Sequence, residues 1–269
     1  MIGLKLATCH RNRNRMKKPE DILITGASSG LGAALARHHA YPGVRLRLWG
    51  RDQTRLEGVA RDCQLAGATV TIRSLDLIDS AAAVAALIDD DLRAPVDIAI
   101  LAAGLGDIAS AGECGEDPAR VLRLGVINFV TPAAMAAALA ERMAARGCGR
   151  IILIGSAAAF HSLPFAAAYA GTKAGLARFA EALRIGVASY GVQVLLVSPG
   201  PIDTPAGRKV PVPGALLMQP EIVARRIDRA SRQGRGHLIL PWPFRLLRLV
   251  DAFLPSRLRD RVLRDIRPS

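Results

Sequence analysis

Cysteine is sparse in this sequence of 269 residues and follows no pattern that would bind a metal. The four cysteines, Cys9, Cys63, Cys114 and Cys148, lie far apart, and no two of them form a Cys-x-x-Cys pair. Isolated cysteines neither cross-link a small secreted domain nor build a zinc site. We therefore expect no metal site, and we expect a cytoplasmic protein with reduced thiols.

Long uncharged segments are also missing. The longest stretch without Lys, Arg, Asp or Glu, residues 151–172, is interrupted by Gly155, His161 and Pro164. This composition predicts a buried strand followed by a polar site rather than a membrane span. Residues 1–18 contain no apolar core of the kind that a secretory signal needs. We expect them to form a disordered, basic N-terminal extension.

Acidic residues are few at the two ends of the chain, which carry almost all of its net charge of +13. Residues 1–18 hold six Lys or Arg and no acid, and residues 225–269 hold twelve Arg against four Asp. The region between them is close to neutral. A nucleic-acid-binding domain usually carries its basic face on the domain itself, so we expect no nucleic-acid partner.

Short runs of apolar and β-branched residues alternate with longer alanine-rich segments, which is typical of repeated βαβ units. Several short runs are continuously apolar, as in parallel strands that are covered on both faces. The pattern predicts strands at 22–25, 44–49, 69–74, 98–101, 150–154, 192–197 and 237–240. It predicts helices at 31–40, 53–66, 81–91, 118–146, 166–189 and 221–233. The expected fold class is α/β: one Rossmann-like domain over residues 19–242, with a doubly wound parallel sheet of about seven strands and helices on both faces.

A glycine-rich turn follows the first predicted strand. Its sequence, Gly26-Ala-Ser-Ser-Gly30-Leu-Gly32, leads from Thr25 into an alanine-rich helix. Gly26 permits the turn, Gly30 lets the backbone approach a pyrophosphate, and Gly32 lets the helix pack close to the strand. The helix N-terminus offers phosphates its unpaired N–H groups and the positive end of its dipole. We therefore predict a dinucleotide site at this junction.

A tyrosine and a lysine stand four residues apart in Tyr169-Ala-Gly-Thr-Lys173, one turn apart on one face of a predicted helix. A free tyrosine has a pKa near ~10, and a neighbouring ammonium is expected to lower that pKa toward a value suited to proton transfer. Ser156 follows an apolar strand, which places its hydroxyl on the ligand side of the sheet. An isolated pair of this kind is usually an exposed helix pair, so its context is what favours chemistry.

The Thr25-Gly-x-x-x-Gly30-x-Gly32 spacing, the Tyr-x-x-x-Lys pair and a serine thirteen residues before the tyrosine resemble the short-chain dehydrogenase/reductase family. The resemblance implies a strand order of 3-2-1-4-5-6-7, a homodimer or homotetramer, and a small carbonyl or alcohol substrate. It also implies a catalytic set in which Tyr169 is the general acid/base, Ser156 holds the substrate oxygen, Lys173 tunes the tyrosine and Asn128 holds a water in the proton relay.

The same resemblance implies a set of cofactor-binding residues beyond the catalytic ones. They are Gly26, Ser28, Ser29, Gly30, Leu31, Gly32, Arg51, Asp76, Leu77, Ala103, Gly104, Tyr169, Lys173, Pro199, Gly200, Ile202 and Thr204. The chain departs from the family at Leu101-Ala102, where two asparagines are usual. This departure removes side-chain hydrogen bonds that would tie the central strands.

The end of the second predicted strand bears on the choice of cofactor. An acidic residue there would bind the ribose 2′-hydroxyl of NAD, whereas an arginine would pair with the 2′-phosphate of NADP. Gly50 occupies the position where NAD-dependent members of the family usually carry Asp, and Arg51 follows it. We therefore expect NADP, with NAD as the alternative. Asp52 is interpreted as the N-cap of the next helix.

The C-terminal segment, residues 243–269, interleaves apolar residues and arginines at helical spacing, and Pro255 divides it. It predicts two short, basic, amphipathic helices. Such helices can lie on an anionic membrane surface as a peripheral contact, or they can pack on the body or on a partner subunit. The sequence leaves these alternatives open.

The predicted reaction is the interconversion of a carbonyl and a secondary alcohol by hydride transfer from nicotinamide. The segments 157–165 and 202–218 are mostly apolar, which favours a hydrophobic or acyl-like substrate. One alternative is an NAD-dependent alcohol dehydrogenase of the same fold. Another is a non-catalytic dinucleotide-binding sensor or scaffold that uses its basic tail to bind a membrane or a partner.

Overall fold

A parallel sheet forms the centre of the protein, as the computed structural model shows for residues 20–106, 116–205, 207–209, 217–244, 246 and 260. Over these residues its strand order is β3-β2-β1-β4-β5-β6-β7, which confirms the predicted order. The strands are β1 Glu20–Thr25, β2 Val44–Gly50, β3 Thr69–Ser74, β4 Ile98–Leu101, β5 Gly149–Ile154, β6 Val192–Pro199 and β7 His237–Leu240. The predicted extension at 1–18 and nearly all of 243–269 lie outside the described residues.

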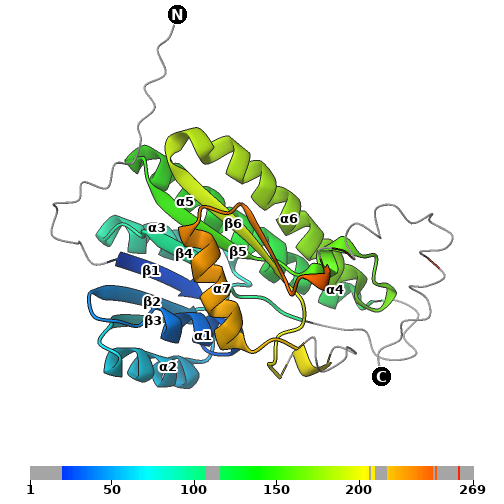
Figure 1. The fold of residues 1–269 in the computed structure, drawn as a ribbon, viewed down its shortest axis with the longest axis horizontal. Coiled ribbons are helices and arrows are strands. Elements are labelled where there is room, and N and C mark those ends of the chain that lie inside the picture. Colours follow the sequence, from blue (N-terminus) through cyan, green and yellow to red (C-terminus); the bar gives the residue numbers. More distant parts are fainter. Residues whose placement is uncertain are drawn as a thin grey trace, which may run out of the picture.

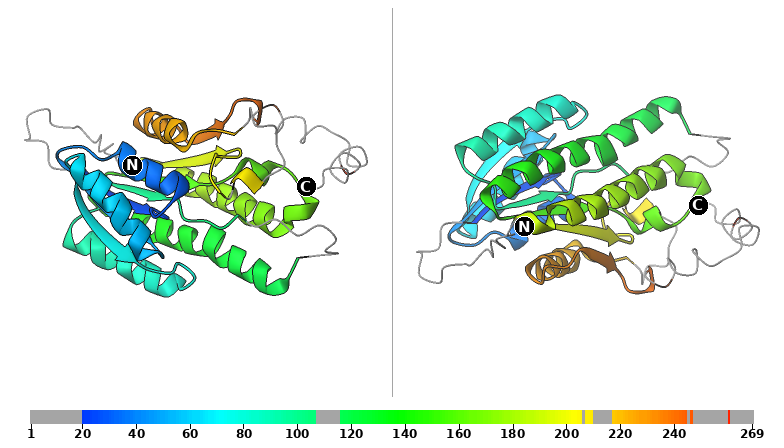
Figure 2. Two further views of the ribbon diagram at one scale, coloured as in Figure 1. Left: turned by 90° about the horizontal axis from the view of Figure 1, so that it is seen from below. Right: turned by 90° about the horizontal axis from the view of Figure 1, so that it is seen from above.

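Helices cover both faces of the sheet, as Figures 1 and 2 show. One layer contains α1 (Gly30–His38), α2 (Gln53–Leu65) and α7 (Pro220–Arg232), and the other contains α3 (Ser80–Arg93), α5 (Thr131–Arg146) and α6 (Ala167–Val187). Because both faces are covered, β1 and β4 are apolar along their length, and Leu23 and Ile24 are buried in opposite cores. The alternation of strands and helices in the sequence thus becomes a doubly wound sheet.

The predicted helix at 118–146 is interrupted in the structure. It consists of α4 (Pro118–Gly125), a π-helical turn at Val126–Val130 and α5. A single π-turn inserts one residue into the helical repeat, and such turns often occur at functional sites. Asn128 lies in the middle of this turn and is completely buried. The hydrophobic period alone does not reveal the interruption, because apolar residues continue through the segment on both sides of Asn128.

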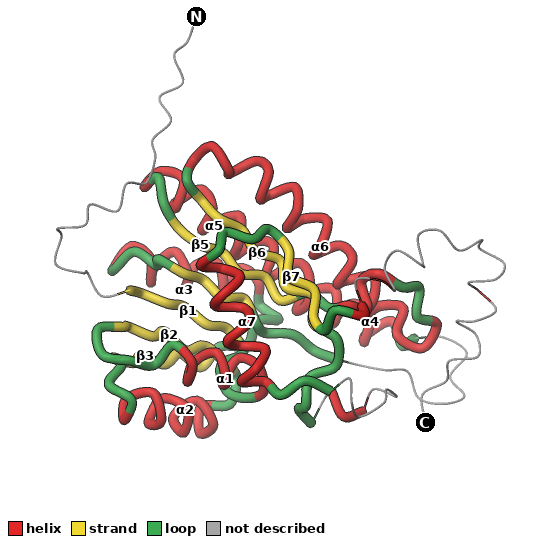
Figure 3. Tube along the Cα trace, viewed as in Figure 1, coloured by secondary structure: helices red, strands yellow, loops and turns green. Residues whose placement is uncertain are grey.

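The loops that follow the carboxyl ends of the strands gather at one edge of the sheet (Figure 3). This is the edge at which open α/β sheets bind their ligands. The glycine turn leaves β1 here, Arg51 leaves β2, and Ser156 and Pro199 lie at the ends of β5 and β6. Residues far apart in the sequence therefore reach one site because their strands are parallel.

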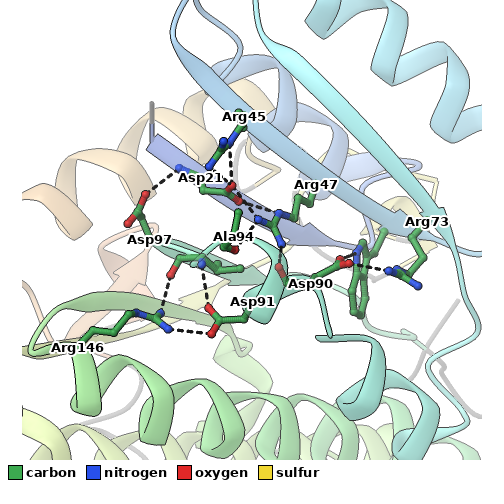
Figure 4. A network of polar contacts seen from close by, with 11 residues as sticks. Asp21, Arg45, Arg47, Arg73, Asp90, Asp91, Ala94, Asp97 and Arg146 are labelled. Carbon is green, nitrogen blue, oxygen red and sulfur yellow. Dashed lines mark hydrogen bonds and ion pairs between the residues drawn. The ribbon is translucent and has the colours of Figure 1, made fainter. Parts of the chain in front are cut away.

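The opposite edge of the sheet carries a network of buried ion pairs (Figure 4). The carboxylate of Asp21 at the start of β1 pairs with Arg47 on β2, with 2.8 Å between Oδ1 and Nε. Asp91 near the end of α3 accepts a hydrogen bond from the Val96 amide at 2.9 Å and pairs with Arg146 on α5 at 2.8 Å. These contacts join α3 and α5 to the amino-terminal ends of the strands, far from the ligand edge.

Within the described residues, one helical stretch, Pro118–Arg146, is long and apolar enough to cross a membrane by length and composition alone. Its apolar residues include Met135, Leu139 and Met143, which are buried in the core on one face of the sheet. This packing accounts for the apolar character of the stretch.

Candidate active site

A cleft of about 1190 Å³ opens along the ligand edge of the sheet. It is larger than the ~300–1,000 Å³ usual for one drug-sized ligand, so it can accept a dinucleotide together with a second molecule. Every residue predicted to bind the cofactor lines this cleft, from Gly26 in the glycine turn to Thr204 after β6. Ser156, Tyr169 and Lys173 line it as well. Asn128 does not, because it lies behind the wall.

The glycine turn is shaped by close contacts that side chains would prevent. A Cβ on Gly26, whose φ is +69°, would lie 2.8 Å from the Cα of Ala103, and a Cβ on Gly32 would lie 2.1 Å from the Gly26 carbonyl oxygen. The turn therefore presses against the end of β4 on one side and α1 on the other. Ser29 is the N-cap of α1 but makes no capping hydrogen bond through its side chain. The N-terminus of α1 thus faces the cleft with the donors that a pyrophosphate requires.

The glycine turn is tied to the neighbouring strand without the asparagines usual in the family. The Ala103 amide donates a hydrogen bond to the Thr25 hydroxyl at 3.2 Å. This contact links the ends of β1 and β4, which Leu101 and Ala102 cannot do through their own side chains. The ends of β1 and β4 at the floor of the cleft therefore remain linked, although Leu101 and Ala102 replace the usual asparagines.

Two arginines lie at the end of the cleft beside β2. Arg51 is exposed and forms no ion pair with any other residue that the structure describes. Arg55, on the first turn of α2, also lines the cleft, and its Nε lies 3.1 Å from Oδ2 of Asp52. The Asp52 carboxylate accepts a hydrogen bond from the Arg55 amide, so it caps α2 as the sequence predicts. Gly50 leaves room for the Ser28 hydroxyl, which a Cβ would approach to 3.2 Å.

Ser156, Tyr169 and Lys173 converge at the centre of the cleft from two elements. Ser156 follows β5, and the other two residues lie on the first turns of α6. Ser156 and Tyr169 are joined by a side-chain hydrogen bond. The Nζ of Lys173 lies 6.0 Å from the centroid of the Tyr169 ring and donates a hydrogen bond to the Ile154 carbonyl oxygen at 3.0 Å. The hydroxyl, phenol and ammonium are therefore held as one group.

Burial dominates the protonation of this group. Loss of hydration raises the pKa of the Tyr169 phenol above its usual value, and the hydrogen bond with Ser156 opposes that rise. The lowering of the tyrosine pKa expected from the sequence is therefore not found. The physical reason is that the phenol's own loss of hydration is the larger effect, while the ammonium of Lys173 is bound to the Ile154 carbonyl oxygen.

Asn128 acts on the backbone of the loop after β4. Its Oδ1 accepts a hydrogen bond from the Leu105 amide at 2.8 Å, and its Nδ2 donates one to the Leu105 carbonyl oxygen at 2.9 Å. A Cβ on Gly104 would lie 3.1 Å from that Oδ1 and 3.3 Å from the Nζ of Lys173. The asparagine side chain therefore lies close to the lysine, with Gly104 between them, and fixes the loop that passes there.

The segment after β6 closes the cleft opposite the glycine turn. A Cβ on Gly30 would lie 3.2 Å from Cγ2 of Thr204, so the two predicted cofactor-binding segments face each other. On the other side of this segment, the ring of Phe244 lies against Gly200, where a Cβ would approach Cε2 to 2.7 Å. Phe244 also lines the cleft.

Three residues near the site were missed by the sequence analysis. Arg55 could have been found from its place in the first turn of the helix that follows Arg51. Phe244 had no signal, because it comes from the far end of the chain. Glu116 also had none: its carboxylate accepts hydrogen bonds from the Ala168 amide at 3.0 and 3.2 Å, 52 residues later. That contact caps the N-terminus of α6, directly before Tyr169.

A cradle for a dinucleotide and a Ser–Tyr–Lys group whose lysine is buried, in one cleft, define the class of nucleotide-dependent oxidoreductases. The sequence matches the family described as short chain dehydrogenase over residues 20–212. It is 30% identical over 248 residues to an uncharacterized oxidoreductase of Myxococcus xanthus, covering 91% of this chain and 96% of that protein. It is 32% identical over 214 residues to 17-beta-hydroxysteroid dehydrogenase type 1 of Homo sapiens, covering 77% of this chain and 62% of that enzyme. The chain belongs to the short-chain dehydrogenase family and is an NAD(P)-dependent oxidoreductase.

Solved structures show the same architecture. A short-chain dehydrogenase from Sphingobium yanoikuyae in complex with NADPH has a TM-score of 0.75 and 28% identity, covering 92% of this chain and 96% of that one. A bulky-bulky ketone specific alcohol dehydrogenase from Comamonas testosteroni has a TM-score of 0.75 and 26% identity, covering 93% of this chain and 96% of that one. The chain therefore shares its fold with solved short-chain dehydrogenases, one of which was solved in complex with NADPH.

Proposed function

We propose that the protein interconverts a hydrophobic ketone and its secondary alcohol with NADP(H), using Tyr169 as the general acid/base. The observation that carries the proposal is the hydrogen-bonded Ser156–Tyr169 pair beside a buried Lys173, in the same cleft as the glycine cradle. A hydroxyl, a phenol and an ammonium gathered at the ligand edge of the sheet suit proton transfer to a substrate oxygen.

The nicotinamide cofactor, when bound, supplies or accepts the hydride, and the chain supplies position and protons. Ser156 donates a hydrogen bond to the substrate oxygen, which stabilises the negative charge that develops there. Tyr169 donates its phenolic proton to the same oxygen during reduction. Lys173 stabilises the resulting phenolate by its charge, because its ammonium lies 6.0 Å from the centroid of the ring. Asn128 supports the proton relay by holding the Leu105 loop beside the lysine.

The preference for NADP rests on the two arginines at the β2 end of the cleft. Arg51 has no acidic partner among the described residues, and Arg55 is oriented by Asp52. An unpaired guanidinium suits a 2′-phosphate, whereas no carboxylate stands at the position of Gly50 to select the 2′-hydroxyl of NAD. The related Sphingobium structure contains NADPH, which supports the same choice.

The hydrophobic substrate is supported by the lining of the cleft beyond Ser156. Leu163 and Phe165 come from the segment before α6, and Phe244 comes from the segment after β7. A wall of this kind binds a bulky apolar body and leaves orientation to Ser156 and Tyr169. Relatives named for a bulky ketone and for a hydroxysteroid fit the same size and polarity.

The test is a panel of ketones followed by the absorbance of NADPH or NADH. Bulky aryl or alicyclic ketones should be reduced with NADPH, and Tyr169→Phe should lower kcat by roughly 100- to 10,000-fold while NADPH binding is retained. Full activity of Tyr169→Phe would overturn the proposed acid/base role.

The cofactor preference is tested separately. Arg51→Ala should weaken NADPH binding about tenfold and leave NADH binding nearly unchanged, because one charge-assisted hydrogen bond is lost. Arg61→Ala, which removes an exposed arginine of α2 outside this cleft, is the matched control. Equal affinity for both cofactors in the wild type would contradict the NADP preference, and tighter binding of NADH would favour the NAD alternative.

A further inference from the structure

The outward face of α7 carries a row of arginines. Arg225, Arg226 and Arg229 are exposed, and the helix buries Val223 and Ile227 on its opposite side. Residues 225 and 229 are one turn apart on one stripe, and residue 226 lies beside them. Figure 1 shows α7 at the front of the molecule, on the outer side of the sheet.

These arginines lack partners in the part of the chain that the structure describes. No ion pair or side-chain hydrogen bond involves Arg225, Arg226 or Arg229 there, whereas Arg232 at the end of the helix pairs with Asp228. Arg235, just after the helix, is exposed and likewise unpaired within the described residues. Glu221, in the first turn of the helix, is an exposed acid, so the face keeps an excess of positive charge that attracts an anionic surface.

Exposed apolar side chains accompany the same flank. Ile222 on α7 is 37% exposed, and Trp242, two residues after β7, is 68% exposed. Figures 1 and 2 agree that α7 and the segment after β7 run along one flank of the molecule. Tryptophan is favoured at membrane interfaces, where its ring is apolar and its N–H remains wet.

We propose that this flank, the outward face of α7 with Trp242, binds the anionic surface of a lipid bilayer. A bilayer can bind both the arginines and the exposed apolar side chains. Headgroup phosphates pair with the guanidinium groups, and the indole of Trp242 and the side chain of Ile222 insert into the membrane interface. A nucleic acid would satisfy only the arginines. The surface is distinct from the segment 243–269 and consists of residues that the structure describes.

The test uses the full-length protein and vesicles of phosphatidylcholine alone or mixed with phosphatidylglycerol. The wild type should co-sediment with the mixed vesicles only, and binding should fall with added salt. The triple variant R225Q/R226Q/R229Q should bind roughly 100-fold more weakly, since each arginine near an anionic surface contributes about a fivefold gain in affinity. Reduction of a water-soluble ketone should be unchanged, because none of these residues lines the cleft.

A matched variant controls for net charge. R61Q/R93Q/R178Q removes the same three charges from exposed positions on α2, α3 and α6, and it should bind vesicles as the wild type does. Equal weakening in both triple variants would show a diffuse charge effect and overturn the proposal. Equal binding of wild type and R225Q/R226Q/R229Q would overturn it as well.

Trp242 gives a readout of contact with the bilayer. The chain has two tryptophans, and Trp49 is only 1% exposed, so a change in fluorescence on adding vesicles reports on Trp242. Its emission should shift to shorter wavelength with phosphatidylglycerol vesicles, and Trp242→Phe should abolish the shift. Vesicle binding without the shift would contradict the proposed flank. Arginine-dependent binding to duplex DNA in place of vesicles would overturn the lipid assignment.

Discussion

The Lys173 ammonium donates a hydrogen bond to the Ile154 carbonyl oxygen at 3.0 Å and thereby joins α6 to the end of β5. Burial excludes water from this contact and lowers the pKa of Lys173 to about 8. A lysine with this pKa is mostly charged at pH 7 and loses its charge as the pH rises through 8. The charge state of the active site should therefore change within the range of an ordinary assay.

This lowered pKa predicts the pH dependence of the reaction. Reduction requires the protonated lysine and the protonated tyrosine, so kcat/KM for the ketone should be level below pH 7 and should fall tenfold per pH unit above about 8. Lys173→Arg keeps a positive charge at every accessible pH. Its activity should be lower, but the fall near pH 8 should be absent from its profile. A fall at the same pH in Lys173→Arg would assign the titration to another group.

Phe244 is predicted to set the size of the substrate that the cleft accepts. Its ring lies against Gly200 and forms part of the cleft wall. Phe244→Ala should raise KM for compact aryl ketones by roughly 30-fold, because apolar contact of roughly 2 kcal/mol is lost, and should improve activity on bulkier ketones. Trp242→Ala removes an exposed aromatic side chain two residues away and should leave both values unchanged. The measurement is KM for ketones of increasing width in both variants. The same change of KM in Trp242→Ala as in Phe244→Ala would contradict a specific role of Phe244.

Glu116 is predicted to be a positioning residue for Tyr169. The N-cap of α6, Ala166, provides no side-chain hydrogen bond, and the Glu116 carboxylate instead caps the helix through the Ala168 amide. Glu116→Ala should cost about 1 kcal/mol of stability and lower the melting temperature by ~2–4 °C.

The catalytic effect of the same change separates positioning from a purely structural role. Glu116→Ala should lower kcat several-fold with little change in KM, because the phenol of Tyr169 is no longer held in place. Glu116→Gln keeps an acceptor oxygen and should restore most of kcat. A drop in melting temperature without a drop in kcat would leave Glu116 as a helix cap only.

Much of this arrangement could be predicted from the sequence because parallel strands bring their ends together. Residues of the site can be recognised in the sequence by their type and by their place at a strand end. Examples are the glycine turn after β1, Arg51 after β2 and Ser156 after β5, which the sheet places in one cleft. Tyr169 and Lys173 are fixed to each other by one helical turn. Their spacing therefore carries over directly into geometry.

The remainder depended on contacts between distant segments. Glu116 reaches α6, and Phe244 reaches Gly200, through packing that has no local periodicity. The π-turn around Asn128 is invisible in the sequence because apolar residues continue through it from α4 into α5. The pKa of Tyr169 was wrongly expected to fall, since residue spacing reveals the neighbouring charge but not the depth of burial.

Asp91 is predicted to stabilise the fold without affecting the reaction. Burial opposes its ionisation, but hydrogen bonds from the Val96 amide, Arg142 and Arg146 outweigh burial and lower its pKa. Removing one partner of a buried ion pair costs ~3–5 kcal/mol, and the two arginines are partly hydrated at 27% and 25% exposure, so Asp91→Ala should cost about 2–3 kcal/mol. Urea denaturation at pH 7 measures this loss. Asp89→Ala, which removes a half-exposed acid of the same helix, should change stability by less than ~0.5 kcal/mol.

The pH dependence of that loss identifies its cause. Because the pKa of Asp91 is lowered in the folded state, its contribution is present above the unfolded value near ~4 and disappears as the pH falls through the folded value. The stability difference between wild type and Asp91→Ala should therefore shrink as the pH is lowered from 5 toward 3. Ketone reduction should be the same in both proteins at 25 °C, because Asp91 lies at the edge of the sheet opposite the cleft. A constant difference across this pH range would show that the loss comes from packing rather than from the charge of the carboxylate.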